Sequence, residues 1–296
     1  MTTVAKFFYS DPSSYAGRPW SKVDGGGQNY QLQVVEKTVQ DIAGREKEFG
    51  VDVSGFQVIE SPAQERDFDD DARITTKYYA EVEELLRTNL KGVKKVVIFD
   101  HTIRKRVDNA ARKPVRMVHV DQTQKAAEAR VRRHVTGDDT EELIRGRFQI
   151  INVWRPIGHE AADFPLAVAD FRSTKKEDFV EVDLLYPKRA EGEDNDDRGK
   201  ERPPAEINNG TSEGYEVKGE TFGVVDSAEH KWYYERNMRP DQVMLLKCFD
   251  SRGEGVEGGW KGIARCTPHT AFEDPLTPTD AKPRQSIEVR TLVFYE

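Results

Sequence analysis

Arg116-Met-Val-His-Val-Asp-Gln122 predicts the strand around which the rest of this sequence is arranged. It overlaps the apolar-rich run of residues 114–121 and ends in a His-x-Asp pair. Because side chains two positions apart point to the same face of a strand, His119 and Asp121 place an imidazole beside a carboxylate. With one more histidine they form the two-histidine, one-carboxylate set that holds Fe(II) on one side and leaves open positions.

The His-x-Asp pair by itself is a weak signal. Of the six histidines, only His119 has an acidic residue two places later. A motif of two fixed residues nevertheless recurs easily by chance, and the alternative is an exposed strand end with two unrelated polar side chains. The metal hypothesis therefore depends on what the rest of the chain supplies.

The composition describes a folded protein with a heavily solvated surface. The 296 residues suffice for one large or two small domains, and 36% are hydrophobic against 33% charged. A net charge of −8 argues against a nucleic-acid binder, and the basic run Arg130–Arg133 is typical of the polar side of a helix. No stretch is apolar for long enough to cross a membrane. Cys248 and Cys266 lie in apolar runs, which indicates buried free thiols and a cytosolic setting.

Strand signals outnumber helix signals in the second half of the chain. Dense charge without apolar periodicity over 188–212 predicts a mobile surface loop. We expect one domain, residues 1–296, in which N-terminal strands and a helix from 1–93 pack on a β core formed by 94–296. The fold class is mainly β with flanking helices, as an antiparallel barrel or jelly roll. Helices are expected over 72–89, 123–135 and 138–145, and strands over 4–9, 30–39, 94–100, 147–156, 166–173, 179–186, 215–225, 231–234, 242–249 and 286–295.

Several common catalytic motifs are missing from the sequence. No Gly-x-Gly-x-x-Gly follows a strand, no Walker loop is present, and no Gly-x-Ser-x-Gly elbow occurs. Dinucleotide, P-loop and hydrolase functions therefore lose their support.

A third metal ligand is expected from a late strand on the same wall of the barrel. His269 is the natural candidate, because it lies on the penultimate strand signal after a Gly-rich loop. The alternatives are His230, at the start of a strand with a solvent-exposed edge, and His101, before a basic loop.

Beyond His269 the chain passes a Pro-rich turn and reaches Arg284-Gln-Ser286. Arg284 and Ser286 share a strand face, and the planar guanidinium suits one carboxylate. This arrangement is what the distal carboxylate of a 2-oxo diacid requires when its other end chelates a metal ion.

Together these motifs resemble the Fe(II)/2-oxoglutarate-dependent oxygenases. More narrowly, they resemble a mostly fungal group of hydroxylase/desaturases that includes a gibberellin desaturase and relatives of a cephalosporin 7α-methoxylation protein. The resemblance runs from about Tyr30 to the C-terminus. It rests on Phe99-Asp-His-Thr-Ile-Arg104, His119-Val-Asp-Gln-Thr123, Asn152-Val-Trp-Arg-Pro156, Pro165-Leu-Ala-Val-Ala-Asp170, Pro240-Asp-Gln-Val-Met-Leu-Leu-Lys247, Pro268-His-Thr-Ala-Phe272 and Ser286-Ile-Glu-Val-Arg290.

The resemblance implies a double-stranded β-helix, that is, a jelly-roll or cupin-like core. It also implies Fe(II), 2-oxoglutarate and O2 as cofactor and co-substrates, and a specialised metabolite as the small-molecule substrate. No catalytic residue beyond the metal centre is expected. The gap between His269 and Arg284 is longer than in the compact Arg-x-Ser enzymes of the superfamily, so Arg290, on the same strand face, is a second candidate for the 2-oxoglutarate anchor.

Polar residues that follow or end two core strands are candidates for the substrate pocket. Arg155 has an alternative role as a structural ion-pair partner, for example of Asp170. The full set of pocket candidates is His101, Arg104, Asn152, Trp154 and Arg155.

Two other functions use the same residues differently. A cupin-like isomerase or lyase would keep the metal ligands and dispense with 2-oxoglutarate. A non-catalytic β-sandwich binding module would leave His119 and His269 as surface residues. The sequence does not choose the substrate, the outcome between hydroxylation and desaturation, or the oligomeric state.

Overall fold

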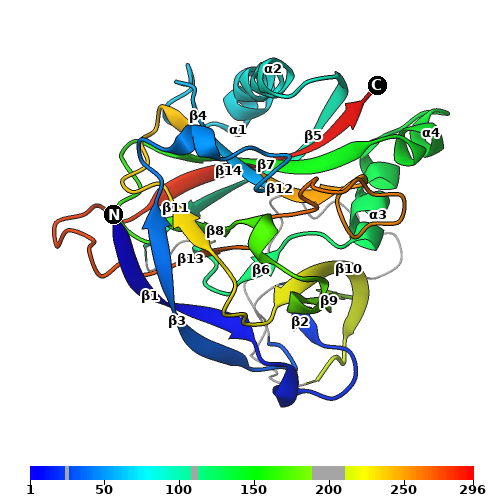
Figure 1. The fold of residues 1–296 in the computed structure, drawn as a ribbon. Coiled ribbons are helices and arrows are strands. Elements are labelled where there is room, and N and C mark those ends of the chain that lie inside the picture. The colour runs from blue at the N-terminus through cyan, green and yellow to red at the C-terminus, as the bar shows by residue number, and fades with distance from the viewer. Residues whose placement is uncertain (24–26, 108–112, 189–210) are drawn as a thin grey trace.

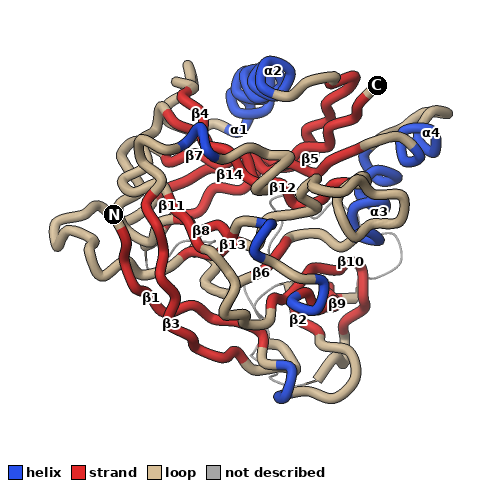
Figure 2. The backbone as a smooth tube through the Cα atoms, in the orientation of Figure 1, coloured by secondary structure: helices blue, strands red, loops and turns tan. Residues whose placement is uncertain are grey.

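The computed structural model describes residues 1–23, 27–107, 113–188 and 211–296. The predicted charged loop 188–212 lies almost wholly outside them. In the described part of the chain the strands form two sheets that face each other, coloured red in Figure 2. This arrangement, with few helices, confirms the predicted jelly-roll class.

The larger sheet is curled and brings together strands from distant parts of the chain. Its short central strands carry the predicted histidines, and they are flanked by longer strands on both sides (Figure 1). In spatial order the nine strands are β1 (Thr2–Ser10), β3 (Leu32–Asp41), β11 (Trp232–Tyr234), β8 (Leu166–Ala169), β13 (His269–Ala271), β6 (His119–Val120), β10 (Tyr215–Val224), β9 (Phe179–Pro187) and β2 (Trp20–Lys22).

The smaller sheet has five antiparallel strands. In spatial order they are β4 (Phe56–Glu60), β12 (Gln242–Asp250), β7 (Phe148–Pro156), β14 (Gln285–Tyr295) and β5 (Val93–Lys105). All except β4 have nine residues or more. β3 pairs with β11 and β4 pairs with β12, so the first 93 residues contribute strands to both sheets.

The central strand β7 is buried along its whole length, which explains its strong sequence signal. Its outer residues Ile151 and Val153 pack in a core cluster with helix α2 (Tyr79–Asn89). Of its inner residues, Trp154 belongs to a cluster between the two sheets, whereas Phe148 and Ile150 pack in a cluster with residues of the helices that follow β6. Because side chains alternate along a strand, β7 separates an apolar outer layer from an inner layer that can carry polar groups.

Two groups of helices cover the five-stranded sheet. In Figure 1, α2 lies on its outer side, whereas α3 (Gln124–His134) and α4 (Thr140–Arg145) lie at one end. Thr123 caps α3 by accepting a hydrogen bond from the Ala126 amide, and basic residues occupy its last turn, as the helix dipole favours. No helix in the described ranges is long and apolar enough to cross a membrane.

Several predicted elements differ in detail. The strand predicted at Arg116–Gln122 is limited to β6, and the strand expected over 166–173 ends at Ala169. The single helix expected over 72–89 consists of α1 (Asp71–Arg73), a π-helical turn over Ile74–Tyr78, and α2. The strand that carries His269, β13, is short and begins at that residue. The preceding residues bond to loops and to β12, as in the hydrogen bonds from the Ala264 amide to the Asp52 carbonyl and from the Thr267 amide to the Lys247 carbonyl.

Candidate metal centre and adjoining cavity

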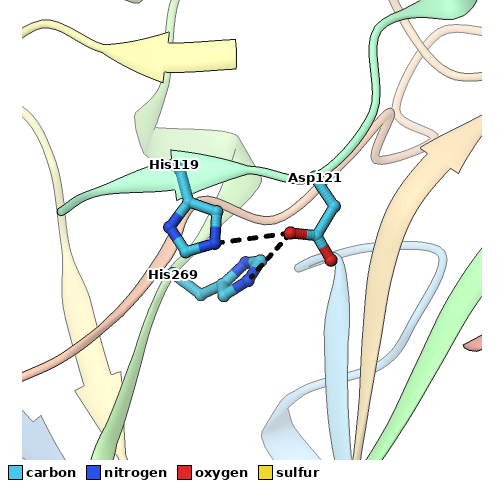
Figure 3. A group of neighbouring side chains, drawn as sticks. All are labelled: His119, Asp121 and His269. Carbon is cyan, nitrogen blue, oxygen red and sulfur yellow. Dashed lines mark ion pairs between the residues drawn. The ribbon is translucent and has the colours of Figure 1, made fainter. Parts of the chain in front are cut away.

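Three predicted ligands converge between the sheets (Figure 3). His119 on β6 and His269 on β13 are directly opposite each other in an antiparallel pair, and their ring centroids are 4.4 Å apart. Asp121 follows β6 and turns its Oδ1 atom towards both rings, 3.3 Å from Nε2 of His119 and 3.9 Å from Nε2 of His269. One donor atom from each residue lies within 4.8 Å of the others.

The hydrogen bonds behind each imidazole select the nitrogen that faces the centre. Nδ1 of His119 lies 2.8 Å from the Met117 carbonyl oxygen, and Nδ1 of His269 lies 3.0 Å from that of Thr267. Only a protonated Nδ1 can donate to a carbonyl, so both rings keep Nε2 for a ligand. Histidines that bind a metal usually donate their other ring N–H to a carbonyl or carboxylate oxygen in this way.

The charges at the centre also suit a cation. Burial tends to raise the pKa of Asp121, but the hydrogen bond from His119 and the nearby positive groups hold it well below its usual value. Burial lowers the pKa of His269. For His119 burial acts in the same direction, but the hydrogen bond to Asp121, the charge of Asp121 and the hydrogen bond to Met117 together outweigh it and raise the pKa overall. An ionised carboxylate thus sits between two imidazoles, where a divalent cation could replace the shared proton.

The residue set fits Fe(II). Two imidazole nitrogens and one carboxylate oxygen form the set used by non-haem iron enzymes. Both histidines are already oriented by the backbone, and Asp121 is ionised between them. The donors are therefore arranged for a metal ion before one binds.

A cavity adjoins these three residues. Its lining is mixed, because charged and polar side chains alternate with a few apolar ones. Arg104 and Trp154, both predicted pocket residues, line it together with Arg284. The complete lining is Arg104, Val115, His119, Asp121, Trp154, Leu166, His269, Thr270, Ala271, Arg284 and Glu288.

Arg284 is a buried cation without an ion-pair partner among the described residues. Its side chain donates from Nη1 to the Phe164 carbonyl oxygen over 2.6 Å, while Nε has no hydrogen-bond partner in the described part of the chain. The residue is only 2% exposed. Burial, with the positive charge of Arg104 nearby, lowers the pKa of Arg284 to about 9. A buried guanidinium in this state is poised to receive an anion.

Arg290, the second candidate anchor, has its charge balanced already. It pairs with Asp100 over 2.9 Å and with Glu288 over 3.1 Å. Burial tends to lower the pKa of Arg290, but the surrounding carboxylates, Glu288 first, raise it. It is not among the residues that line the cavity. Ser286 is buried on the same strand face, between Arg284 and Glu288.

Three predicted pocket residues lie outside the cavity lining. Asn152 donates from Nδ2 to Oδ2 of Asp121, over 2.6 Å, and so belongs to the surroundings of the metal centre. His101 faces outward from β5, where it contacts Tyr79 and Asp71. Arg155 faces outward from β7 and donates to the Tyr78 hydroxyl and the Pro240 carbonyl oxygen.

The outward position of His101 and Arg155 follows from strand alternation. The two inward residues Asp100 and Thr102 flank His101, and Trp154 precedes Arg155. Asp170, the suggested partner of Arg155, pairs with Arg172 instead. His230 is also excluded as a ligand of this centre, because Tyr9 and Asp178 bond both of its ring nitrogens.

Glu288 and Cys248 contribute to the surroundings of the site but were not predicted. Glu288 lines the cavity, and Cys248 on β12 has its sulfur 3.7 Å from Oδ2 of Asp121. Strand alternation could have identified Glu288, because it lies two residues after Ser286 and therefore on the same face of the strand. Cys248 carried no such signal, since its neighbour Asp121 is far away in the sequence.

Comparisons with known proteins identify relatives of this chain. The family model described as "Oxidoreductase/YMDC permease-like domain" matches residues 7–294. The hydroxylase/desaturase efuI of Hormonema carpetanum is 33% identical over 283 residues, which cover 90% of this chain and 85% of efuI. The Fe(II)/2-oxoglutarate-dependent dioxygenase nvfI of Aspergillus novofumigatus is 32% identical over 230 residues, which cover 76% of this chain and 69% of nvfI.

A solved structure agrees with these matches. The iron and alpha-ketoglutarate-dependent endoperoxidase NvfI superposes with a TM-score of 0.78 at 26% identity. The superposition covers 99% of this chain and 98% of that one. The similarity therefore extends over the whole fold, including both sheets that surround the candidate ligands.

Proposed function

The chain belongs to the family of Fe(II)/2-oxoglutarate-dependent oxygenases that includes these fungal hydroxylase/desaturases, and we propose that it oxidises a small specialised metabolite. The reaction consumes O2 and 2-oxoglutarate and releases succinate and CO2. One oxygen atom enters succinate. The other enters a hydroxylated product, or leaves as water when the substrate is desaturated.

His119, Asp121 and His269 would hold the iron. The observation that carries this assignment is the convergence of their donor atoms within 4.8 Å, with both histidines backed by carbonyl groups. When bound, Fe(II) supplies the activation of O2 that amino-acid side chains cannot provide. The protein contributes the ligand arrangement and the shape of the surrounding space.

Arg284 would bind the distal carboxylate of 2-oxoglutarate. Its guanidinium lines the cavity and has an unpaired Nε, whereas Arg290 is already paired with two carboxylates. A carboxylate at Arg284 would supply the missing counter-charge and accept a charge-assisted hydrogen bond. Ser286 would add a hydroxyl donor from the same strand face.

Trp154 and Arg104 would shape the space next to the metal centre. Trp154 presents an aromatic wall, and Arg104 adds a positive charge at the same cavity. Apolar side chains such as Val115 and Leu166 complete the lining and reduce the water around the reacting groups. These residues would thus hold the co-substrate in place and position one substrate carbon next to the metal centre.

Residues 1–296 would act as one oxygenase domain. Strands from the first 93 residues pair with core strands in both sheets, and the family match spans residues 7–294. We also propose a cytosolic location, because both cysteines are buried free thiols, which reducing compartments maintain.

Anaerobic addition of Fe(II) and then 2-oxoglutarate to the apoprotein tests the function. We expect a visible charge-transfer band that requires both additions and is absent in His119→Ala and His269→Ala. The matched control is His159→Ala, because His159 contacts the neighbouring Glu160 carbonyl oxygen and is not among the residues that line the cavity. Its band should equal that of the unaltered protein.

Two results would contradict the proposal in different ways. Metal binding without any response to 2-oxoglutarate would favour an isomerase or lyase of the cupin type. Failure of the unaltered protein to bind metal would favour a binding module.

A further inference from the structure

We infer that Asn152 and Cys248 act as positioning residues that hold one oxygen of Asp121 away from the metal, so that the carboxylate binds through Oδ1 alone. This inference rests on the proposed function, because such a restraint matters only if His119, Asp121 and His269 hold a metal ion. It goes beyond that function because it states which residues contact the second carboxylate oxygen of Asp121.

The two oxygens of Asp121 have different surroundings. Oδ1 faces Nε2 of both histidines, whereas Oδ2 accepts a hydrogen bond from Nδ2 of Asn152 over 2.6 Å. A carboxylate only accepts, so the amide nitrogen of Asn152, not its oxygen, must face Asp121. The orientation of the Asn152 side chain is therefore determined by its partner.

Cys248 approaches the same oxygen. Its sulfur lies 3.7 Å from Oδ2 of Asp121, and the side chain is fully buried. A thiol is a weak donor, so its contribution should be smaller than that of the amide. The two groups nevertheless occupy Oδ2 from two neighbouring strands.

The sheet holds both positioning residues rigidly. Asn152 lies on the central strand β7, opposite Leu246 of β12 on one side and Arg290 of β14 on the other. The register between β12 and β7 shifts between Lys247 and Phe249, which leaves Cys248 as the extra residue of a bulge. Bulges re-aim side chains, and here the thiol is directed towards Asp121.

A carboxylate that binds through one oxygen occupies one metal position instead of two. The remaining positions then stay open for the co-substrates, which is the feature that distinguishes this ligand set. Groups that orient the ligands of a metal typically change its affinity about 10- to 100-fold when removed. Asn152, which the sequence placed in the substrate pocket, would therefore act through Asp121.

Equilibrium titration of the apoprotein with Co(II), followed by its visible absorption, tests this role. Asn152→Leu keeps the number and branching of the side-chain heavy atoms and removes the amide. We expect about 10- to 100-fold weaker Co(II) binding. At saturating Co(II) we also expect an altered absorption spectrum, because the freed carboxylate changes the metal's geometry. A purely structural role of Asn152 would leave the spectrum of the bound metal unchanged.

Cys248→Ala provides the second test, with Cys266→Ala as its matched control. Both thiols are buried, but only Cys248 contacts Asp121. We expect a measurable loss of Co(II) affinity in Cys248→Ala that is smaller than in Asn152→Leu, and no loss in Cys266→Ala.

The outcomes separate this inference from the proposed function. If the unaltered protein binds Co(II) while folded Asn152→Leu and Cys248→Ala match it in affinity and spectrum, the positioning role is overturned and the metal site stands. If Asn152→Leu does not fold, the Cys248→Ala and Cys266→Ala pair still decides. Absence of Co(II) binding in the unaltered protein would overturn both proposals.

Discussion

The guanidinium of Arg284 lies over the indole ring of Trp154, with 5.6 Å between its central carbon and the ring centroid. Trp154 is on the inner face of β7, and Arg284 immediately precedes β14, the strand beside it. The electron-rich ring face offsets part of the buried charge. It does not replace a carboxylate, and so Arg284 remains available to an anion that enters the cavity.

Replacement of Arg284 should therefore affect 2-oxoglutarate more than replacement of Arg290. Loss of one member of a buried, hydrogen-bonded charge pair costs about 2–5 kcal/mol, so we expect Arg284→Ala to weaken 2-oxoglutarate binding roughly 30-fold or more. Arg290→Ala should have a much smaller effect, because its partners are Asp100 and Glu288. The dependence of the charge-transfer band on 2-oxoglutarate concentration measures both values. The reverse order would assign the anchor to Arg290.

The same arginine should lower the stability of the apoprotein. A buried charge without a counter-charge is costly, so Arg284→Met, which retains most of the volume, should raise the free energy of unfolding by about 1 kcal/mol or more. Urea denaturation of the metal-free proteins measures the difference. Metal ion with 2-oxoglutarate should raise the Tm of the unaltered protein more than that of Arg284→Met. A less stable Arg284→Met apoprotein would mean that Arg284 is mainly a structural residue.

Lys247 is a second buried charge, but it is paired with two carboxylates. Its replacement should therefore lower the stability of the protein, in contrast to the replacement of Arg284. Nζ of Lys247 lies 2.7 Å from Oδ2 of Asp250 and 2.8 Å from Oδ1 of Asp52. Removing one partner of a buried ion pair costs about 3–5 kcal/mol, so Lys247→Met should be strongly destabilised in urea. Arg239→Met is the control, because Arg239 pairs with Glu60 and Asp241 at an exposed site, where such pairs contribute less than about 1 kcal/mol. Equal effects of the two variants would contradict this distinction.

Glu235 should make stability depend on pH. Burial raises its pKa from 4.5 to about 7, with Glu46 and Asp41 acting in the same direction against a hydrogen bond from Gln242 and the charge of Arg239. Since the folded-state pKa lies above the unfolded one, the stability linked to its proton is complete below pH about 4.5 and is lost as the pH rises through about 7.

Glu235→Gln removes this titration. We expect its Tm to exceed that of the unaltered protein by an amount that grows between about pH 5 and about pH 8. Glu257→Gln, at an exposed carboxylate, should show no such trend. Parallel Tm profiles for Glu235→Gln and the unaltered protein would show that the carboxyl group titrates alike in the folded and unfolded states.

Local patterns in the sequence determined the strands and the faces of the site. Alternation along residues 148–156 predicts that Asn152 and Trp154 share one face, and the structure agrees. The spacing of His119 and Asp121 likewise predicts two donors side by side. These features depend on neighbours in the chain, whose relative positions follow from backbone geometry.

The tertiary structure decided which distant residues meet. The sequence offered three histidines as the third ligand, and the pairing of β13 with β6 brought His269 to His119. It also offered two arginines on one strand face, and Asp100 on the neighbouring β5 already pairs with Arg290, whereas Arg284 has no such partner among the described residues. Strand register and ion pairing across a sheet depend on segments far apart in the chain, so side-chain periodicity does not reveal them.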